Sequence, residues 1–188
     1  MDKINYLVLL RGINVGGNNL IKMDDLKNIF VEMDLKNVKT YIQSGNILFM
    51  DHEKNKIKLK KKIEKALFEK INLKINVLIL TFTEIKEILN NIPYKFGDDN
   101  KKYKYDIVFL IEPLSVKEVM EEIQTKKTKD QIYGGEKVLY IKRFIEKLTG
   151  SYLSKIMKTQ MWQNITIRNL NTTKKLYELM LEREINIE

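Results

Sequence analysis

The chain has 188 residues and no cysteine, which excludes disulfide bonds, thiol nucleophiles and cysteine-bound metal centres. A net charge of +9 accompanies 44% hydrophobic and 31% charged residues, a composition typical of globular proteins. No run of about eighteen apolar residues is present, and the apolar part of "MDKINYLVLLRG" is too short for a signal peptide. We therefore expect a cytoplasmic protein that does not bind membranes.

Lysine carries most of the positive charge, and the densest run extends from Lys54 to Lys70. Within it, Ile63, Ala66 and Leu67 recur at helical spacing, so we interpret the lysines as the solvated face of an amphipathic helix. An anion-binding face is the alternative. Because 30 lysines stand against four arginines and one alanine, AT-rich codons explain much of the charge, and nucleic-acid binding does not follow from it.

The first half of the chain has the pattern of strand, helix, strand, strand, helix and strand. The expected strands are residues 5–11, 37–43, 46–50 and 74–82, and the expected helices are residues 23–33 and 54–70. This order is the ferredoxin-like arrangement.

The same order recurs between residues 104 and 168. Strands are expected at 103–112 and 164–168, with a hairpin over 129–143 that turns at Gly134 and Gly135, and helices at 83–92, 114–124, 151–158 and 171–183. We therefore predict an α+β fold of two tandem ferredoxin-like halves, residues 1–82 and 83–188, with an extra C-terminal helix in the second half.

The topology of the first half predicts a candidate binding site. In a ferredoxin-like sheet, the loop after the first strand and the turn between the second and third strands lie at the same end. The loop "RGINVGGNN" and the turn "QSGN" should therefore be neighbours. Backbone N–H groups and polar side chains at this end suit a small anionic ligand. The candidate ligand-binding residues are Arg11, Gly12, Asn14, Gly16, Gly17, Gln43, Ser44 and Asn46.

The glycines of this loop do not form a nucleotide-binding motif. Gly12 and Gly17 have the spacing of a P-loop, but Asn18 and Asn19 occupy the positions of its lysine and hydroxyl residue. Two interpretations stay open. The loop is a tight corner in which Arg11 forms a structural salt bridge, or it is an arginine-and-amide site for a small anion or polar group.

A second candidate site lies in "TIRNLNTTKK", where Arg168, Asn169 and Thr172 are the proposed ligand-binding residues. Asn171 or Thr172 is expected to cap the last helix, and the lysines of its first turn favour an anion there. Simple capping with surface lysines is the alternative. We also expect Arg168 to reach a carboxylate or backbone carbonyls rather than bulk solvent.

Catalytic residue sets are missing from the sequence. The only histidine, His52, is expected in an exposed loop, and Ser44 has no evident base, so no catalytic residue, metal or cofactor is predicted. An enzyme that uses Arg11 with Ser44 or Tyr41 is a third hypothesis. Nucleic-acid binding is not favoured, because the strand "NILFM" lacks the aromatic pattern of RNA-recognition sheets. No feature predicts an oligomeric state.

The segments LLRGINVGG, TYIQSGN and T-x-RN-x-x-T closely resemble motifs of the bacterial domain-of-unknown-function family 1697. The resemblance spans nearly the whole chain. It implies two tandem ferredoxin-like halves and no established activity. The motif positions are Arg11, Gly12, Asn14, Gly16, Gly17, Tyr41, Gln43, Ser44, Gly45, Asn46, Thr166, Arg168, Asn169 and Thr172.

Overall fold

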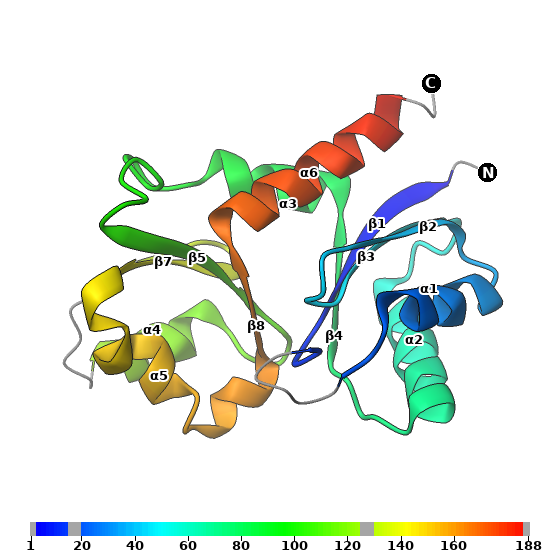
Figure 1. Cartoon of the computed structure of the whole chain (residues 1–188), viewed down its shortest axis with the longest axis horizontal. Coiled ribbons are helices and arrows are strands. Elements are labelled where there is room, and N and C mark those ends of the chain that lie inside the picture. The colour runs from blue at the N-terminus through cyan, green and yellow to red at the C-terminus, as the bar shows by residue number, and fades with distance from the viewer. Residues whose placement is uncertain (1–2, 15–19, 125–129, 186–188) are drawn as a thin grey trace. The chain divides into compact units, whose positions relative to one another are not determined.

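The computed structural model describes residues 3–14, 20–124 and 130–185. The chain forms two compact units: unit 1 comprises Met1–Ile85 and Leu176–Glu188, and unit 2 comprises Lys86–Lys175. Each unit contains one four-stranded antiparallel sheet with helices packed on it (Figure 1). The predicted α+β fold of two ferredoxin-like halves with a C-terminal helix is confirmed.

Unit 1 follows the predicted strand and helix order. Its elements are β1 (Ile4–Leu10), α1 (Met23–Glu32), β2 (Lys36–Tyr41), β3 (Asn46–Asp51), α2 (Lys56–Ile71), β4 (Val77–Thr81) and the start of α3 (Phe82–Asn90). The strands are arranged β2-β3-β1-β4, so β1 is central and antiparallel to both of its neighbours. This order places the end of β1 beside the turn that joins β2 to β3.

Alternation along the strands builds the core of unit 1. Tyr6, Val8 and Leu10 of β1 pack with Phe30 of α1 and Ile63 of α2. Both helices cover one face of the sheet (Figure 1). These side chains are fully buried or nearly so. Burying each large apolar side chain stabilises the fold by roughly 1.5–3 kcal/mol, so this face supplies much of the stability of unit 1.

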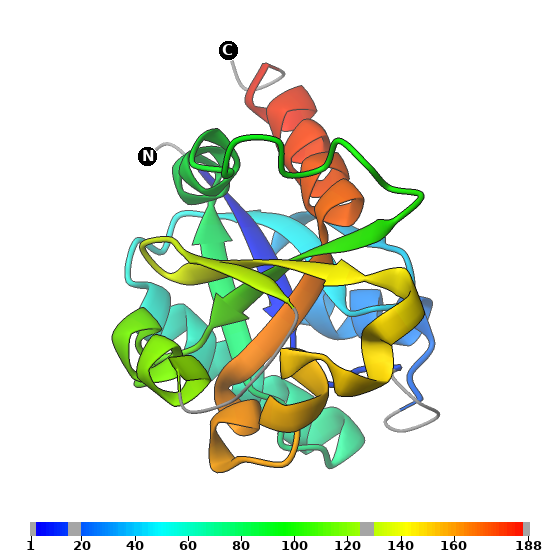
Figure 2. The same cartoon turned by 90° about the vertical axis from the view of Figure 1, so that its left-hand side faces the viewer.

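Unit 2 repeats the arrangement. Its elements are β5 (Tyr103–Leu110), α4 (Val116–Gln124), β6 (Gln131–Gly134), β7 (Val138–Phe144), the 3-10 helix η1 (Ile145–Gly150), α5 (Tyr152–Ile156), the 3-10 helix η2 (Gln160–Asn164), β8 (Ile165–Asn169) and the start of α6 (Leu170–Ile185). The strands are arranged β6-β7-β5-β8. Helices α4 and α5 pack on one face of this sheet, against Val108, Leu139 and Ile141 (Figure 2).

Helix α6 begins in unit 2, and from Leu176 onward it belongs to unit 1. Two contacts attach its later part to unit 1. The Tyr177 ring stacks on Phe82 with 5.3 Å between the ring centroids, and Asn5 Nδ2 donates to the Met180 carbonyl at 2.9 Å. No helix among the described residues has the length and apolar character that crossing a membrane requires.

The outer strand β2 is irregular. Its register against β3 shifts between Lys36 and Lys39, and Asn37 within this bulge has a φ of 51°. Arg183 Nη2 of α6 donates to the Asn37 carbonyl. Three features therefore interrupt this edge of the sheet: the bulge, the two exposed lysines, and the arginine that is hydrogen-bonded to a backbone carbonyl.

Candidate functional site

The loop after β1 and the turn between β2 and β3 lie against each other in unit 1. The Leu10 N–H donates to the Gly45 carbonyl at 2.8 Å, and Asn14 Nδ2 donates to the Gln43 carbonyl at 2.9 Å. The adjacency that the strand order predicts is therefore confirmed. We call this region the loop–turn surface and define it as residues 11–14 and 43–46.

Asn14 ties the two ends of its loop together. Its Oδ1 accepts from the Ile21 N–H at 2.8 Å, and its Nδ2 donates to the Ile21 carbonyl at 3.0 Å as well as to Gln43. The backbone of Asn14 is left-handed, with a φ of 54°, a conformation that asparagine tolerates well. The amide of Asn14 thus serves the loop itself. Gly16 and Gly17, also predicted at the site, lie outside the described residues.

Asn46 and Ser44 organise the turn in a similar way. Asn46 is fully buried, and its Nδ2 donates to the Tyr41 carbonyl at 3.0 Å and to Ser44 Oγ at 2.9 Å. Gly45 and Ile42 both have left-handed backbones, with φ of 67° and 47°. Two of the predicted ligand donors are therefore bonded to each other within the turn.

The side chains of Arg11 and Gln43 are the longer polar groups of the loop–turn surface. Gln43 is exposed and Arg11 is half-buried. The Arg11 backbone N–H donates to the Asn76 carbonyl at 3.1 Å, and Gly12 beside it has a φ of 70° that glycine adopts without strain. The backbone of Arg11 is thus fixed at the end of β1, and its charged side chain is partly shielded from water.

Unit 2 repeats the backbone bonds of this corner with an apolar residue in place of Arg11. In unit 1, the Leu10 N–H donates to the Gly45 carbonyl at 2.8 Å, and in unit 2 the Leu110 N–H donates to the Lys137 carbonyl at 3.2 Å. In the same way, the bond from the Arg11 N–H to the Asn76 carbonyl (3.1 Å) corresponds to the bond from the Ile111 N–H to the Asn164 carbonyl (2.8 Å). The position of Arg11 is taken in unit 2 by Ile111, which is 2% exposed. The corner therefore forms with an apolar residue at this position, and the arginine is a particular property of unit 1.

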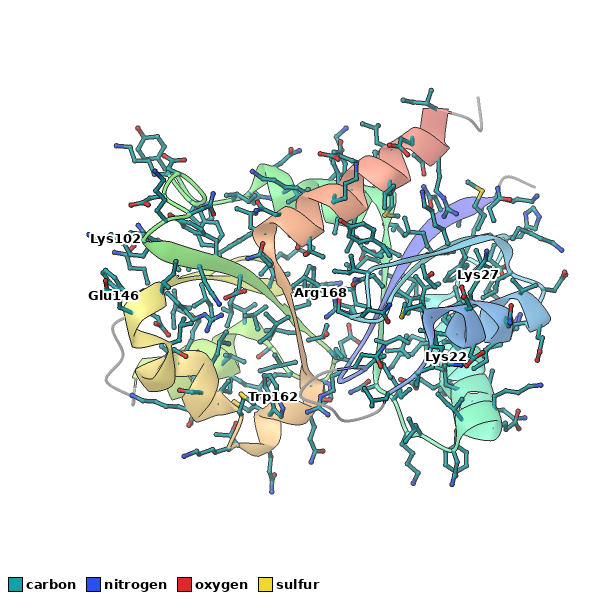
Figure 3. The ribbon with its side chains drawn as sticks, in the orientation of Figure 1. Lys22, Lys27, Lys102, Glu146, Trp162 and Arg168 are labelled. Carbon is teal, nitrogen blue, oxygen red and sulfur yellow. The ribbon has the colours of Figure 1, made fainter. Side chains whose placement is uncertain are left out.

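Arg168, from the second candidate site, is buried in unit 2 and 6% exposed. Its Nη1 donates to Thr166 Oγ1 at 2.9 Å and to the Ile167 carbonyl at 2.8 Å (Figure 3). The expectation that it reaches backbone carbonyls rather than bulk solvent is confirmed. Burial lowers the pKa of Arg168 to about 10. These bonds brace strand β8.

Asn169, rather than Asn171 or Thr172, caps the last helix. Helix α6 starts at Leu170, and Asn169 Oδ1 accepts from the Asn171 N–H at 2.9 Å, which is the bond of an N-cap residue. Asn169 Nδ2 also donates to the Tyr105 carbonyl at 3.1 Å. The predicted cap was wrong because strand β8 continues directly into the helix, which moves the cap to the last strand residue.

We expect Arg168→Lys to lower the free energy of unfolding by roughly 1–3 kcal/mol, the usual cost of losing hydrogen bonds to a charged group. Urea denaturation measures the loss. Lys174→Arg, at an exposed position on α6, is the control and should change stability by less than about 0.5 kcal/mol. Unchanged stability of Arg168→Lys, together with weaker stabilisation by sulfate, would instead place Arg168 in an anion site.

Residues 4–140 match the family model described as "Protein of unknown function (DUF1697)". This match covers well over half of the sequence. The chain belongs to the DUF1697 family. The family resemblance of its sequence is thereby confirmed.

A solved structure is similar to this DUF1697 chain over almost its entire length. It is the conserved bacterial protein SP0830 from Streptococcus pneumoniae, with 27% sequence identity and a TM-score of 0.83. The alignment covers 95% of the DUF1697 chain and 99% of SP0830. No curated protein matches the sequence. The comparisons therefore support the fold and the family and leave the function to be argued from the chain's own residues.

The lysine-rich helix α2 of the DUF1697 chain is amphipathic, as predicted, with Leu59, Ile63 and Leu67 on its buried side. Several of its lysines pair with carboxylates of unit 1: Lys56 with Glu84 (2.5 Å), Lys58 with Glu53 (2.6 Å), Lys70 with Glu32 (2.7 Å), and Lys60 with Glu64. Much of the positive charge on this helix is thus neutralised locally, which supports the interpretation as a solvated face.

One charged pair was not anticipated from the DUF1697 sequence. Asp106 lies in the middle of β5, and Arg143 near the end of β7 donates to Asp106 Oδ2 from Nε at 2.8 Å. The sequence signal is the lone acid within the apolar run "YDIVFLI". The pair can be recognised only when the strand register is known, because 37 residues separate its members.

His52 is exposed, as expected. No cluster of three potential metal ligands occurs among the residues that the structure describes.

Proposed function

We propose that this protein binds a small anionic ligand at the loop–turn surface of unit 1, with Arg11 as its charge partner. The observation that carries the proposal is the difference between the two units. The same corner in unit 2 has equivalent backbone bonds and holds the buried Ile111, so the fold does not require an arginine at this position. A half-buried cation at one corner and a buried apolar residue at the other is a difference that ligand binding would explain.

The chemistry of Arg11 indicates the ligand class. A guanidinium is always charged at neutral pH and presents five donors in a planar fork, which matches the oxygens of a carboxylate or phosphate. The exposed Gln43 adds an amide that can orient a bound anion. Gly12, Asn14, Ser44 and Asn46 then act as supports that fix the loop and the turn. Arg168, Asn169 and Thr172 belong to unit 2.

Two other hypotheses have less support. Nucleic-acid binding by α2 conflicts with the pairing of its lysines to Glu32, Glu53 and Glu84. Catalysis through Ser44 has less support, because its hydroxyl accepts from Asn46 Nδ2 and so takes part in holding the turn together. A cytoplasmic location stays a prediction of the sequence.

Thermal unfolding in the presence of phosphate, sulfate and small carboxylates tests the proposal. At a ligand concentration of 100 times Kd, binding should stabilise the folded protein by about 2.7 kcal/mol. For a protein of this size, that corresponds to a rise in Tm of roughly 5–10 °C. Arg11→Gln should lose most of this rise, since glutamine keeps polarity but not the charged fork.

Lys27→Gln is the matched control, because Lys27 is an exposed cation on α1 outside the loop–turn surface (Figure 3). Its ligand-induced rise in Tm should equal that of the wild type. Each variant is compared with itself without ligand, so any change in intrinsic stability is removed. The proposal fails if Arg11→Gln and the wild type respond equally to every anion.

A further inference from the structure

One face of the second sheet carries a row of aromatic rings. Residues directly opposite each other on neighbouring antiparallel strands point to the same face. The register pairs Tyr103 with Phe144, Tyr105 with Lys142, and Tyr133 with Tyr140. Because alternate residues share a face, all six side chains lie on one side of the sheet. Helices α4 and α5 cover the other side, where they pack against Val108, Leu139 and Ile141.

The inner part of this aromatic face is covered within unit 2. Phe96, from the loop before β5, packs edge-on against Tyr105 and Tyr140, with centroid separations of 4.9 and 5.8 Å. The Tyr140 hydroxyl donates to the Ile88 carbonyl at 2.6 Å. These rings are buried and serve the core.

The outer part of the face is open to solvent. Tyr133 is 40% exposed, Gln131 next to it on the same face is exposed, and Tyr103 and Phe144 are half-buried. Lys102 is exposed at the start of β5 (Figure 3). We call this surface the outer corner of unit 2; its members are Lys102, Tyr103, Gln131, Tyr133, Lys142 and Phe144.

Lysines and rings are interleaved at the outer corner. The Tyr103 and Phe144 rings are 4.6 Å apart between centroids. Lys142 Nζ lies 4.1 Å from the centroid of Tyr103, and Lys102 Nζ lies 5.7 and 5.8 Å from the centroids of Tyr103 and Phe144. Both ammonium groups are thus held beside the aromatic faces by cation–π attraction. Positive charge and stacking surface are therefore presented together.

The charge of the segment before β5 adds to this surface. Lys101 is exposed next to Lys102. The preceding turn carries two exposed acids, Asp98 and Asp99, and Asp99 Oδ1 accepts from the Lys102 backbone N–H at 3.1 Å. A polyanion would therefore meet Lys101, Lys102 and Lys142 at this end of β5, with Glu146 as the exposed acid that follows Phe144 (Figure 3).

We propose that the outer corner of unit 2 binds single-stranded nucleic acid. Bases stack on exposed aromatic rings without regard to sequence, while lysines between the rings neutralise the phosphates. Gln131 supplies an amide that can pair with a base edge. An apolar protein partner would require exposed aliphatic side chains in place of interleaved cations, so the charge pattern favours the nucleic acid.

The position of the rings in the topology supports the proposal. Tyr103 and Phe144 lie on β5 and β7, the first and third strands of a ferredoxin-like half, where RNA-recognition sheets carry the aromatics that stack bases. The first half differs, since the third strand β3 has Leu48 and Met50 on the face turned away from α1 and α2. The missing aromatic pattern in "NILFM" therefore counts against RNA binding by unit 1 alone.

Fluorescence anisotropy with the full chain and labelled oligo(dT) or oligo(U) of about 15 nucleotides tests the proposal. Phe144→Leu and Tyr133→Leu should each weaken binding by about 5- to 100-fold, the effect of losing one stacked base. Lys142→Gln should reduce the slope of log affinity against log salt by roughly 0.7, one phosphate contact. Tyr133 is 40% exposed and more accessible than Phe144, so its variant decides the matter if Phe144→Leu fails to fold.

Two controls in unit 1 are matched to these changes. Phe68→Leu alters a ring on α2 that is 44% exposed, and Lys61→Gln removes an exposed lysine from the same helix. Both should bind like the wild type. Tighter binding of oligo(U) than oligo(dT) would identify RNA as the preferred strand, and the reverse would identify DNA. Three results would each overturn the proposal. The protein could bind duplex DNA or heparin as tightly as the single strand, the control variants could lose as much affinity as the outer-corner variants, or the single strand could fail to bind at low salt.

Discussion

Replacing Asp106 by alanine is expected to lower the free energy of unfolding by about 3–5 kcal/mol. The Asp106 side chain is 9% exposed and its partner Arg143 is 16% exposed, so the variant would leave a guanidinium buried without its carboxylate. The penalty comes mainly from this uncompensated charge. Urea denaturation at neutral pH measures it. Asp106→Asn should lose less, because an amide oxygen still accepts from Arg143.

A double variant separates the buried charge from the packing. Asp106→Leu combined with Arg143→Met removes both charges and keeps the volume, so its stability should lie near or above that of the wild type. A double variant as unstable as Asp106→Ala would show that the loss comes from packing and would contradict the explanation by charge.

The pH dependence of this group has a definite sign. Burial raises the pKa of Asp106 above its ordinary value of 3.8, although Arg143 opposes the shift. The folded protein therefore binds this proton more tightly than the unfolded chain. Protonation of Asp106 therefore favours the folded state. This proton-linked contribution to the free energy of unfolding is fully present below pH 3.8 and is lost as the pH rises through the raised pKa, whereas the pairing with Arg143 that Asp106→Ala removes persists at neutral pH. Stability curves of the wild type and Asp106→Asn should diverge over this range.

Gly45→Ala is expected to lower the free energy of unfolding by about 2–5 kcal/mol. The φ of Gly45 is 67°, and an added Cβ would lie 2.9 Å from Leu10 Cβ and 3.2 Å from Ile13 Cβ. These atoms belong to buried residues next to the backbone, so neither can move aside easily. Thermal or urea unfolding measures the loss.

Two further variants distinguish the causes of this loss. Gly45→Asn fits the left-handed backbone but keeps the clash, so it should remain clearly less stable than the wild type. Gly134→Ala is the control, since the Cβ there meets only Val116 Cγ1, at 3.2 Å. It should change stability by less than about 1 kcal/mol. Equal effects at Gly45 and Gly134 would contradict the close approach described for the turn.

Hydrophobic periodicity predicted the strand and helix order, because alternating and helical patterns are local properties of the sequence. The meeting of the loop after β1 with the turn before β3 could also be predicted, since it follows from strand order alone. The cap of α6 could not, because nothing in "RNLNTT" shows that strand β8 continues directly into the helix.

The roles of Asn14 and Asn46 could be assigned only from the structure. Both are polar residues in turn-like segments, and such residues suit ligand binding and loop bonding equally well. Only their bonds to Ile21, Gln43 and Tyr41 show that their amides hold the loop and the turn. Topology predicts which segments meet, whereas the partner of each side chain depends on distances that the sequence does not contain.

The outer corner of unit 2 was missed for a related reason. Tyr103, Tyr133 and Phe144 come from three strands, and no local window contains all of them. Their shared face depends on the register of β6 and β5 against β7.

The irregular outer strand β2 bears on how the protein behaves at high concentration. A free strand edge is a template on which another chain can add a strand and begin aggregation. In β2, the bulge at Asn37 breaks the regular row of backbone donors and acceptors, and Arg183 already occupies a carbonyl there. Lys36 and Lys39 would also place like charges against an identical incoming strand. The terminal helix that supplies Arg183 thus also protects this edge from intermolecular strand addition, and shortening that helix would remove the protection.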